Sequence, residues 1–135
     1  MGTDSNKALG TAFEEAFAEE LYNRGFWVHL LRQTEAGQPA DLIAARNGKT
    51  FLIDCKVCSS GKFPLSHVEE NQKLAMTEFL ARGNEAGWFA LLVDGETYML
   101  PLSFMMRHPT PYLNRAQIKH YGETLDEWLK EWFVL

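Results

Sequence analysis

Two aspartates and a lysine lie in two short apolar segments that a tight turn joins. Asp41 is at the start of the first segment, and Asp54 and Lys56 are near the end of the second. Only Asn47-Gly48 separates the segments, and both of these residues tolerate the positive φ angles of a type I′ turn. The sequence therefore predicts a β-hairpin that carries all three charged side chains.

The register of this hairpin brings the two aspartates together. A two-residue turn pairs Arg46 with Lys49, and continuing the pairing places Asp41 opposite Asp54, with Lys56 on the same face. Opposed carboxylates have Cβ atoms about 5 Å apart and repel each other. A divalent cation removes this repulsion, and oxygen ligands suit Mg²⁺ or Mn²⁺. The residues therefore fit a metal site for phosphodiester chemistry; the simpler alternative is a solvated sheet face on which Lys56 neutralises one acid.

Size and composition indicate a globular protein. The chain has 135 residues, of which 46% are hydrophobic and 23% are charged. We expect a single domain over residues 1–135, with a core at about 8–102 and a C-terminal helical tail at about 103–135. No apolar run approaches the ~20 residues of a membrane span, and the N-terminus lacks the pattern of a signal peptide. With two cysteines and no disulfide framework, the expected location is the cytoplasm.

The chain is acidic overall, but its charges are unevenly distributed along the sequence. A net charge of −5 argues by itself against a nucleic-acid partner. The acids concentrate in the two ends of the sequence, whereas residues 36–82 carry six basic and five acidic side chains. Two of those five acids are the proposed metal ligands. With a cation bound, this middle stretch becomes the positive part of the molecule, so DNA binding would depend on metal and on salt.

The pattern of apolar residues, caps and turns predicts an α/β fold with a mixed central sheet flanked by helices. Helices are expected at 8–24, from a capping box at Ser66 to about 82, at 114–120 and from Thr124 onward. Strands are expected at 26–31, 40–46, 49–56, 88–93 and 96–100.

Two polar residues fall on or beside the apolar stripes of the expected helices. Glu14 shares a side with Phe17 and Leu21 at helical spacing, and Gln72 stands inside the stripe of the later helix. A half-buried Glu or Gln must find partners. Glu14 at the edge of its stripe could instead reach water, and Gln72 could bond to backbone across the core. If the later helix covers the catalytic face, Gln72 points at the metal site.

These features resemble the PD-(D/E)xK nuclease superfamily. Pro39-Ala40-Asp41 corresponds to its first element and Asp54-Cys55-Lys56 to its second, with one extra residue between the proline and the aspartate. The resemblance implies a restriction-endonuclease-like αβββαβ core. Within the superfamily the chain is most similar to RecU-type Holliday junction resolvases, through the stretch 10–14, Phe63-Pro64-Leu65, the helical Gln72 and the stretch 87–89.

One departure from the RecU pattern concerns the stalk that RecU proteins insert ahead of the first catalytic aspartate. Here only Gln33–Ala40 joins the two strands, so the stalk is missing. A compact phage-type resolvase, similar also to archaeal resolvases and to stand-alone VRR-NUC nucleases, fits the length better.

The resemblance implies a role for each site residue. Asp41, Asp54 and the backbone carbonyl of Cys55 would bind Mg²⁺ or Mn²⁺, with Glu14 supplying or orienting a further ligand. Lys56 would hold the attacking water and stabilise charge on phosphorus, and Gln72 would orient the water or a phosphate oxygen. The products would carry a 5′-phosphate and a 3′-hydroxyl. Candidate phosphate contacts are Lys62, His67, Lys73, Arg46 and Lys49.

The leading hypothesis is therefore a metal-dependent, structure-selective DNA endonuclease of the Holliday junction resolvase type. Symmetric cutting of a four-way junction needs two active sites, so we expect a two-fold homodimer on branched or double-stranded DNA. The alternatives are a nuclease acting on flaps or linear duplex, and a non-catalytic DNA-binding module of the same fold. Cys55 and Cys58 match C-x-x-C, but positions i and i+3 of a strand face opposite sides, which excludes a shared zinc or redox site.

Overall fold

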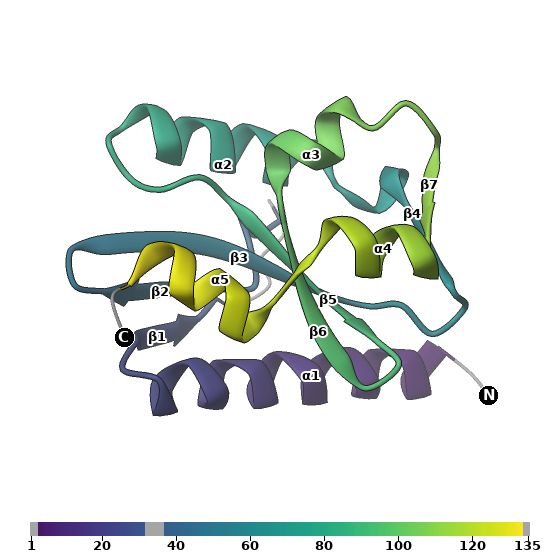
Figure 1. Cartoon of the computed structure of the whole chain (residues 1–135), viewed down its shortest axis with the longest axis horizontal. Coiled ribbons are helices and arrows are strands. Elements are labelled where there is room, and N and C mark those ends of the chain that lie inside the picture. The colour runs from purple at the N-terminus through teal and green to yellow at the C-terminus, as the bar shows by residue number, and fades with distance from the viewer. Residues whose placement is uncertain (1–2, 32–36, 134–135) are drawn as a thin grey trace.

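A six-stranded sheet with helices on both faces forms the centre of the molecule (Figure 1). The computed structural model describes residues 3–31 and 37–133. The helices are α1 (Thr3–Asn23), α2 (Glu70–Ala81), α3 (Leu102–Arg107), α4 (Arg115–Tyr121) and α5 (Leu125–Trp132). The strands are β1 (Trp27–Leu30), β2 (Leu42–Arg46), β3 (Lys49–Val57), β4 (Lys62–Pro64), β5 (Trp88–Val93), β6 (Glu96–Pro101), β7 (Tyr112–Asn114) and β8 (Glu123–Thr124). The succession α1–β1–β2–β3–α2–β5 confirms the expected αβββαβ core.

The sheet is mixed, as the sequence predicts. Its strand order is β1-β2-β3-β5-β6-β8, and β4 pairs with β7 in a separate two-stranded sheet. The β3–β5 pair is parallel and the other pairs are antiparallel. A parallel neighbour needs a crossover, and α2 lies in the connection from β3 to β5. This crossover places α2 over the strand that carries Asp54.

The β2–β3 hairpin has the register that its turn predicts. Asn47 and Gly48 have φ angles of 49° and 81°, and Arg46 pairs with Lys49. The regular pairing ends at Leu42 and Ile53, one residue before Asp41. Asp41 precedes the strand, and its N–H donates to the carbonyl of Ile53 at 3.1 Å. The two aspartates therefore meet where the ladder ends rather than as a regular cross-strand pair.

Each face of the sheet has its own apolar core. On the α1 face, Phe13, Phe17 and Leu21 of α1 pack with Phe51 and with Trp128 of α5. On the opposite face, here called the α2 face, the core is formed by residues of β3, β5, β6, α2, α3 and α4.

The two cysteines belong to different cores, which agrees with the expectation that they face opposite sides of the sheet. Cys55 packs in the core of the α1 face and Cys58 in that of the α2 face, and both are free thiols.

Two helices differ in extent from the sequence expectation. Helix α1 begins at Thr3 rather than at residue 8, and Leu9 is 51% exposed because the buried stripe starts only at Phe13. Helix α2 begins at Glu70, not after Ser66 as the expected capping box requires. Leu65–His67 instead form a single 3-10 turn. Local capping signals were right about the presence of a helix and wrong about where it begins. Residues 33–36 of the expected Gln33–Ala40 connection lie outside the described residues.

The C-terminal part closes the core of the α1 face. Trp128 is fully buried, and its ring contacts the rings of Phe26, Phe51 and Trp88. Thr124 caps α5 and accepts a hydrogen bond from the Glu127 N–H, as the second predicted capping box requires. The tail therefore completes the fold; Leu135, which could extend an apolar interface, lies outside the described residues.

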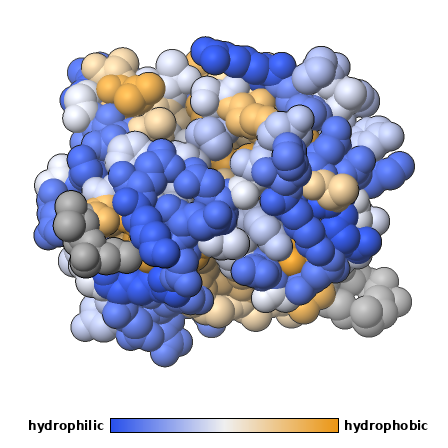
Figure 2. Space-filling model, viewed as in Figure 1, coloured by the Kyte–Doolittle hydropathy of each residue, from blue (hydrophilic) through white to orange (hydrophobic). Residues whose placement is uncertain are grey.

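The surface is mostly polar on the side shown in Figure 2, where apolar patches are small and separate. Among the described residues, no helix combines the length and apolar character that crossing a bilayer requires.

The packing of α2 on β5 depends on a missing side chain at Gly87. A Cβ atom at this position would lie 2.3 Å from Met76 Sδ and 2.7 Å from Met76 Cβ. We expect Gly87→Ala to lower the free energy of unfolding by about 1–3 kcal/mol, measured by urea denaturation. Gly10→Ala is the matched control, because a Cβ there has open space and should add about 0.5–1 kcal/mol to helix α1. An unchanged midpoint in Gly87→Ala would contradict this packing.

Glu123 of β8 makes stability depend on pH. Burial, and then the hydrogen bond and the charge of Glu131, raise the pKa of Glu123 to about 7 from an ordinary 4.5. Because the folded-state pKa is the higher one, the stabilisation is complete below pH 4.5 and is lost as the pH rises through 7.

Glu131→Gln should therefore raise the melting temperature relative to the wild type at pH 8 and not at pH 4. Scanning calorimetry across this range tests the expectation, with the exposed Glu19→Gln variant as the control. A difference that stays constant with pH would refute it.

Candidate active site

Asp41 is held at the end of the hairpin by three groups. Its Oδ1 accepts a hydrogen bond from the side-chain amide of Gln38 at 2.6 Å, and its Oδ2 accepts one from the backbone N–H of Cys55 at 2.7 Å. Its backbone carbonyl accepts from the N–H of Leu31, which follows β1. Asp41 is only 6% exposed. The carboxylate is thus fixed beside β3, the strand that carries the second acid.

Asp54 and Lys56 form a buried ion pair on the α2 face. Asp54 is 1% exposed, and its Oδ2 lies 3.0 Å from Lys56 Nζ. No well-aligned hydrogen bond reaches this oxygen from any described residue. Burial, followed by the charge of Asp41, raises the pKa of Asp54 to about 8, against the opposing effect of Lys56. Burial is the largest single effect on Lys56 and would lower its pKa, but the charge and hydrogen bond of Asp54 and the charges of Asp41 and Glu69 together raise it, so the amine stays protonated.

Gln72 reaches the site from the first turn of α2. Its Nε2 donates to Asp54 Oδ1 at 2.8 Å, and its Oε1 accepts from the N–H of Glu69 at 3.3 Å. The sequence expectation had this side chain orienting water or phosphate. In the structure the side chain is buried and its amide is engaged at both ends, so Gln72 positions Asp54.

Glu14 belongs to α1, which packs on the face of the sheet opposite α2. Burial, followed by the charge and hydrogen bonding of Asp41, raises the pKa of Glu14 to about 7. Lys56 acts in the opposite direction. Glu14 therefore interacts electrostatically with Asp41 and Lys56, which are two of the other residues proposed from the sequence.

The donor atoms fit a hard divalent cation. Asp41 and Asp54 present carboxylate oxygens in a dry site, and one of these oxygens lacks an aligned donor. All-oxygen ligands are what Mg²⁺ and Mn²⁺ prefer. Within residues 3–31 and 37–133, no group of three or more His, Cys, Asp or Glu side chains forms a metal cluster, and Mg²⁺ usually binds through one or two carboxylates. The Cys55 side chain is buried in the core of the α1 face, so only its backbone carbonyl could serve as a ligand.

The sequence analysis missed the group that supports Asp41. The backbone carbonyl of Gln38 accepts a hydrogen bond from the side chain of Asn71 at 3.0 Å, which ties this loop to α2. Gly37 has φ +82°, and a Cβ there would lie 2.6 Å from the Asn71 amide, so glycine permits the close approach. The only local signal was a polar residue three positions before the aspartate. Its partner is 33 residues away in sequence.

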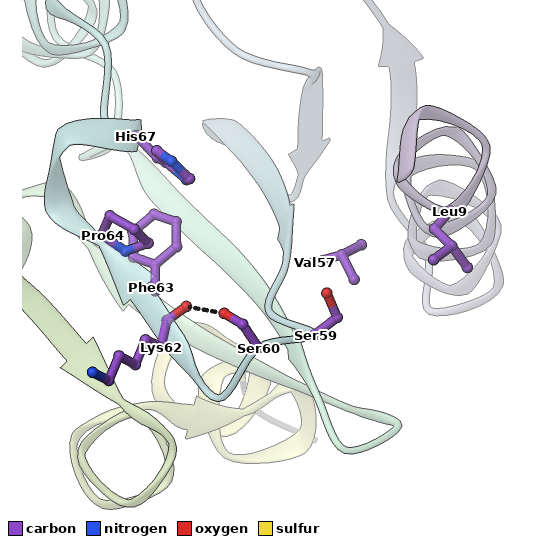
Figure 3. A pocket seen from close by; sticks show the side chains of 8 residues that line it. All are labelled: Leu9, Val57, Ser59, Ser60, Lys62, Phe63, Pro64 and His67. Atoms are coloured by element: carbon purple, nitrogen blue, oxygen red, sulfur yellow. Dashed lines mark hydrogen bonds between the residues drawn. The ribbon is translucent and has the colours of Figure 1, made fainter. Parts of the chain in front are cut away.

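Lys62 and His67, two of the expected DNA contacts, line one groove beyond the end of β3 (Figure 3). The groove has a volume of about 280 Å³ and lies between α1 and β4. Its walls also include Leu9, Val57, Ser59 and Ser60. Val57 is the last residue of β3, and its side chain packs on the α1 face, so the groove adjoins the end of this strand.

The other three expected DNA contacts lie elsewhere. Lys73 pairs with Glu70 of the same helix at 3.0 Å. Arg46 and Lys49 flank the hairpin turn, at the end remote from Asp41, and their cations lie over aromatic rings of the C-terminal segment, 4.4 Å from Phe133 and 5.8 Å from Trp132. The structure therefore does not gather them with the catalytic set.

Two solved structures share this fold over nearly the whole chain. The Holliday junction resolvase Hjc of Archaeoglobus fulgidus matches with a TM-score of 0.70 and 18% identity, over 90% of this chain and 99% of that one. The bacterial homing endonuclease I-Ssp6803I matches with a TM-score of 0.61 and 13% identity, over 96% of this chain and 93% of that one. At these identities the likeness concerns the fold. No curated protein sequence matches the chain.

A family model provides the stronger assignment. The model of the archaeal Holliday junction resolvases (Hjc) matches residues 5–131. This range includes the β2–β3 hairpin, almost all of α1, all of α2 and nearly all of the C-terminal part. The match supports the archaeal type of resolvase and not the RecU or phage type. The chain belongs to the archaeal Holliday junction resolvase family, and it is a DNA endonuclease of that class.

Proposed function

We propose that this resolvase cuts branched DNA with Mg²⁺, for which Mn²⁺ can substitute, held by Asp41, Asp54 and the backbone carbonyl of Cys55. The supporting observation is the placement of two buried carboxylates at the end of one hairpin, with Lys56 Nζ 3.0 Å from Asp54 Oδ2. Glu14 would complete or orient the ligand set from α1. Bound there, the metal would polarise a phosphate oxygen and lower the pKa of a water molecule.

The protein groups then have distinct tasks. Lys56 is a protonated amine beside the carboxylates, so it can donate a hydrogen bond to the attacking water and to the charge that builds on phosphorus. Gln72 and Gln38 hold Asp54 and Asp41 in place and need not touch the substrate. In-line attack on phosphorus with the 3′-oxygen as the leaving group would give a 5′-phosphate and a 3′-hydroxyl.

The groove with Lys62 and His67 supports a path for the DNA backbone. Both residues are exposed and line a groove that also holds Ser59 and Ser60, and cationic and hydroxyl groups suit phosphate oxygens. The Lys62 amine lies 4.6 Å from the centre of the Tyr112 ring. Lys73, Arg46 and Lys49 stay predictions as further phosphate contacts. In an acidic chain this local path would make binding sensitive to salt.

The assembly and location follow from the substrate. A four-way junction is resolved by two symmetric cuts, so we propose a two-fold homodimer of a single nuclease domain acting in the cytoplasm, where the DNA is. The short connection before Asp41 is consistent with the stalkless, phage-like variant of the RecU pattern. Flaps and linear duplex are the competing substrates.

Asp54→Asn should abolish cleavage while the protein stays folded. We expect the rate on a labelled four-way junction with Mg²⁺ to fall roughly 10³-fold or more, because several kcal/mol of charge stabilisation by the metal would be lost. Asp94→Asn is the matched control: Asp94 is an exposed turn residue with φ 51° that tolerates asparagine, and the variant should cut normally. Flap and linear duplex run in parallel give the substrate preference. Full activity in Asp54→Asn would defeat the assignment.

Gln72→Leu separates positioning from direct catalysis. Without the amide, Asp54 loses its 2.8 Å partner, so the Mg²⁺ concentration for half-maximal cleavage should rise about 10- to 100-fold. The rate at saturating metal should change much less, and the rise in melting temperature on adding Mg²⁺ should need correspondingly more metal. A loss of rate at saturating metal with unchanged metal affinity would show instead that Gln72 acts on the substrate.

A further inference from the structure

The edge strand β1 carries two exposed aromatic side chains. It pairs only with β2 among the described strands, and Trp27 is 61% exposed at its start. His29, two residues on, is also exposed. The two rings are parallel within 11°, with centroids 6.0 Å apart. The outer side of an edge strand has unpaired backbone groups, so this strand and its two rings are accessible to a partner.

These two rings share a sheet face with the catalytic residues. His29 is the cross-strand partner of Ile43, which is the partner of Leu52, and directly paired residues point to the same face. Leu52 and Asp54 are two residues apart on β3, so both project toward α2. Trp27 is two residues before His29 on β1, so its side chain points to the same face. The aromatic pair therefore lies on the α2 face, on the same side as the proposed metal site.

Strand geometry places the pair within reach of a bound DNA strand. His29 is two strands across from β3 and two residues along from Asp54, which amounts to about 12 Å, and Trp27 is about 17 Å away. At about 3.4 Å per base pair, these distances correspond to about four or five base pairs from the scissile phosphate.

We propose that Trp27 and His29 form a stacking platform for a nucleobase that becomes exposed where the DNA branches. This proposal rests on the proposed function, and it adds a reason why the nuclease would select branched DNA over continuous duplex. Base faces are covered in a continuous duplex and become accessible at a branch point, so a flat aromatic surface favours branched DNA. Every base has a π face, so the platform would work without reading sequence.

The test measures DNA binding in a variant that cannot cleave the DNA. In the Asp54→Asn background, Trp27→Ala should weaken binding to a four-way junction about 5- to 100-fold, the range found for loss of one stacked base. Binding to linear duplex should change little. Trp27→Phe should keep most of the affinity, and Tyr22→Ala, which removes an aromatic ring that is 69% exposed on α1, should have no effect.

A second signal reports the stacking itself. A 2-aminopurine base placed one to five nucleotides from the cleavage site should be quenched by the Asp54→Asn protein and less so by the double variant. Unchanged junction affinity and unchanged quenching in Trp27→Ala would overturn the platform. A second result would also overturn it: Trp27→Ala changes the oligomeric mass measured by light scattering, while the junction affinity of each dimer stays the same. Trp27 would then be a residue of the subunit interface.

The two proposals fail in different ways. If the wild type cuts the junction, Asp54→Asn does not, and Trp27→Ala binds as tightly as its parent, the platform is wrong and the metal-dependent mechanism stands. A wild-type protein that neither binds nor cuts any of the DNA substrates would refute both.

Discussion

Two carboxylates confined together away from water are the constraint on which the rest of the structure depends. Asp41 and Asp54 are 6% and 1% exposed, and the charge of Asp41 disfavours the ionised form of Asp54. Such an arrangement destabilises the folded state unless a cation or a proton relieves it. Lys56 supplies part of that relief from one side. A proton on Asp54, or a divalent cation as proposed above, would provide the remainder.

The surrounding elements act mainly to keep this pair in place. The parallel step from β3 to β5 requires a crossover, and that crossover carries α2 with Gln72 over Asp54. Asn71, on the same helix, holds the loop of Gln38, which in turn holds Asp41. One short helix therefore positions both acids through separate hydrogen bonds. The opposite face contributes Glu14 and a core that the C-terminal helix completes.

How much of this could be read from the sequence depended on the range of the interactions. The Asn47-Gly48 turn is local, and it gave the register of the hairpin and the proximity of the aspartates. Helical periodicity singled out Gln72 because a polar residue inside an apolar stripe needs a partner. The start of α2 was misplaced, because two local signals lie three residues apart: the helix uses a capping box between Glu69 and Gln72, and not the one expected at Ser66.

The missing parts were those that only tertiary structure defines. The bond between Asn71 and Gln38 joins residues 33 positions apart, with no pattern linking them. The exposure of Trp27 could not be inferred either, because an apolar strand at the sheet edge reads like one in its centre. Lys62 and His67 were candidate phosphate contacts, but only the folded chain shows that they line one groove after β3.

The most direct test of the account is a crystal structure grown with Mn²⁺ and measured at a wavelength where manganese scatters anomalously. The account predicts one anomalous peak in contact with carboxylate oxygens of both Asp41 and Asp54, at about 2.1–2.2 Å, with Lys56 beside them. Clear density for these two side chains with no peak between them, or with the carboxylates turned apart, would contradict it.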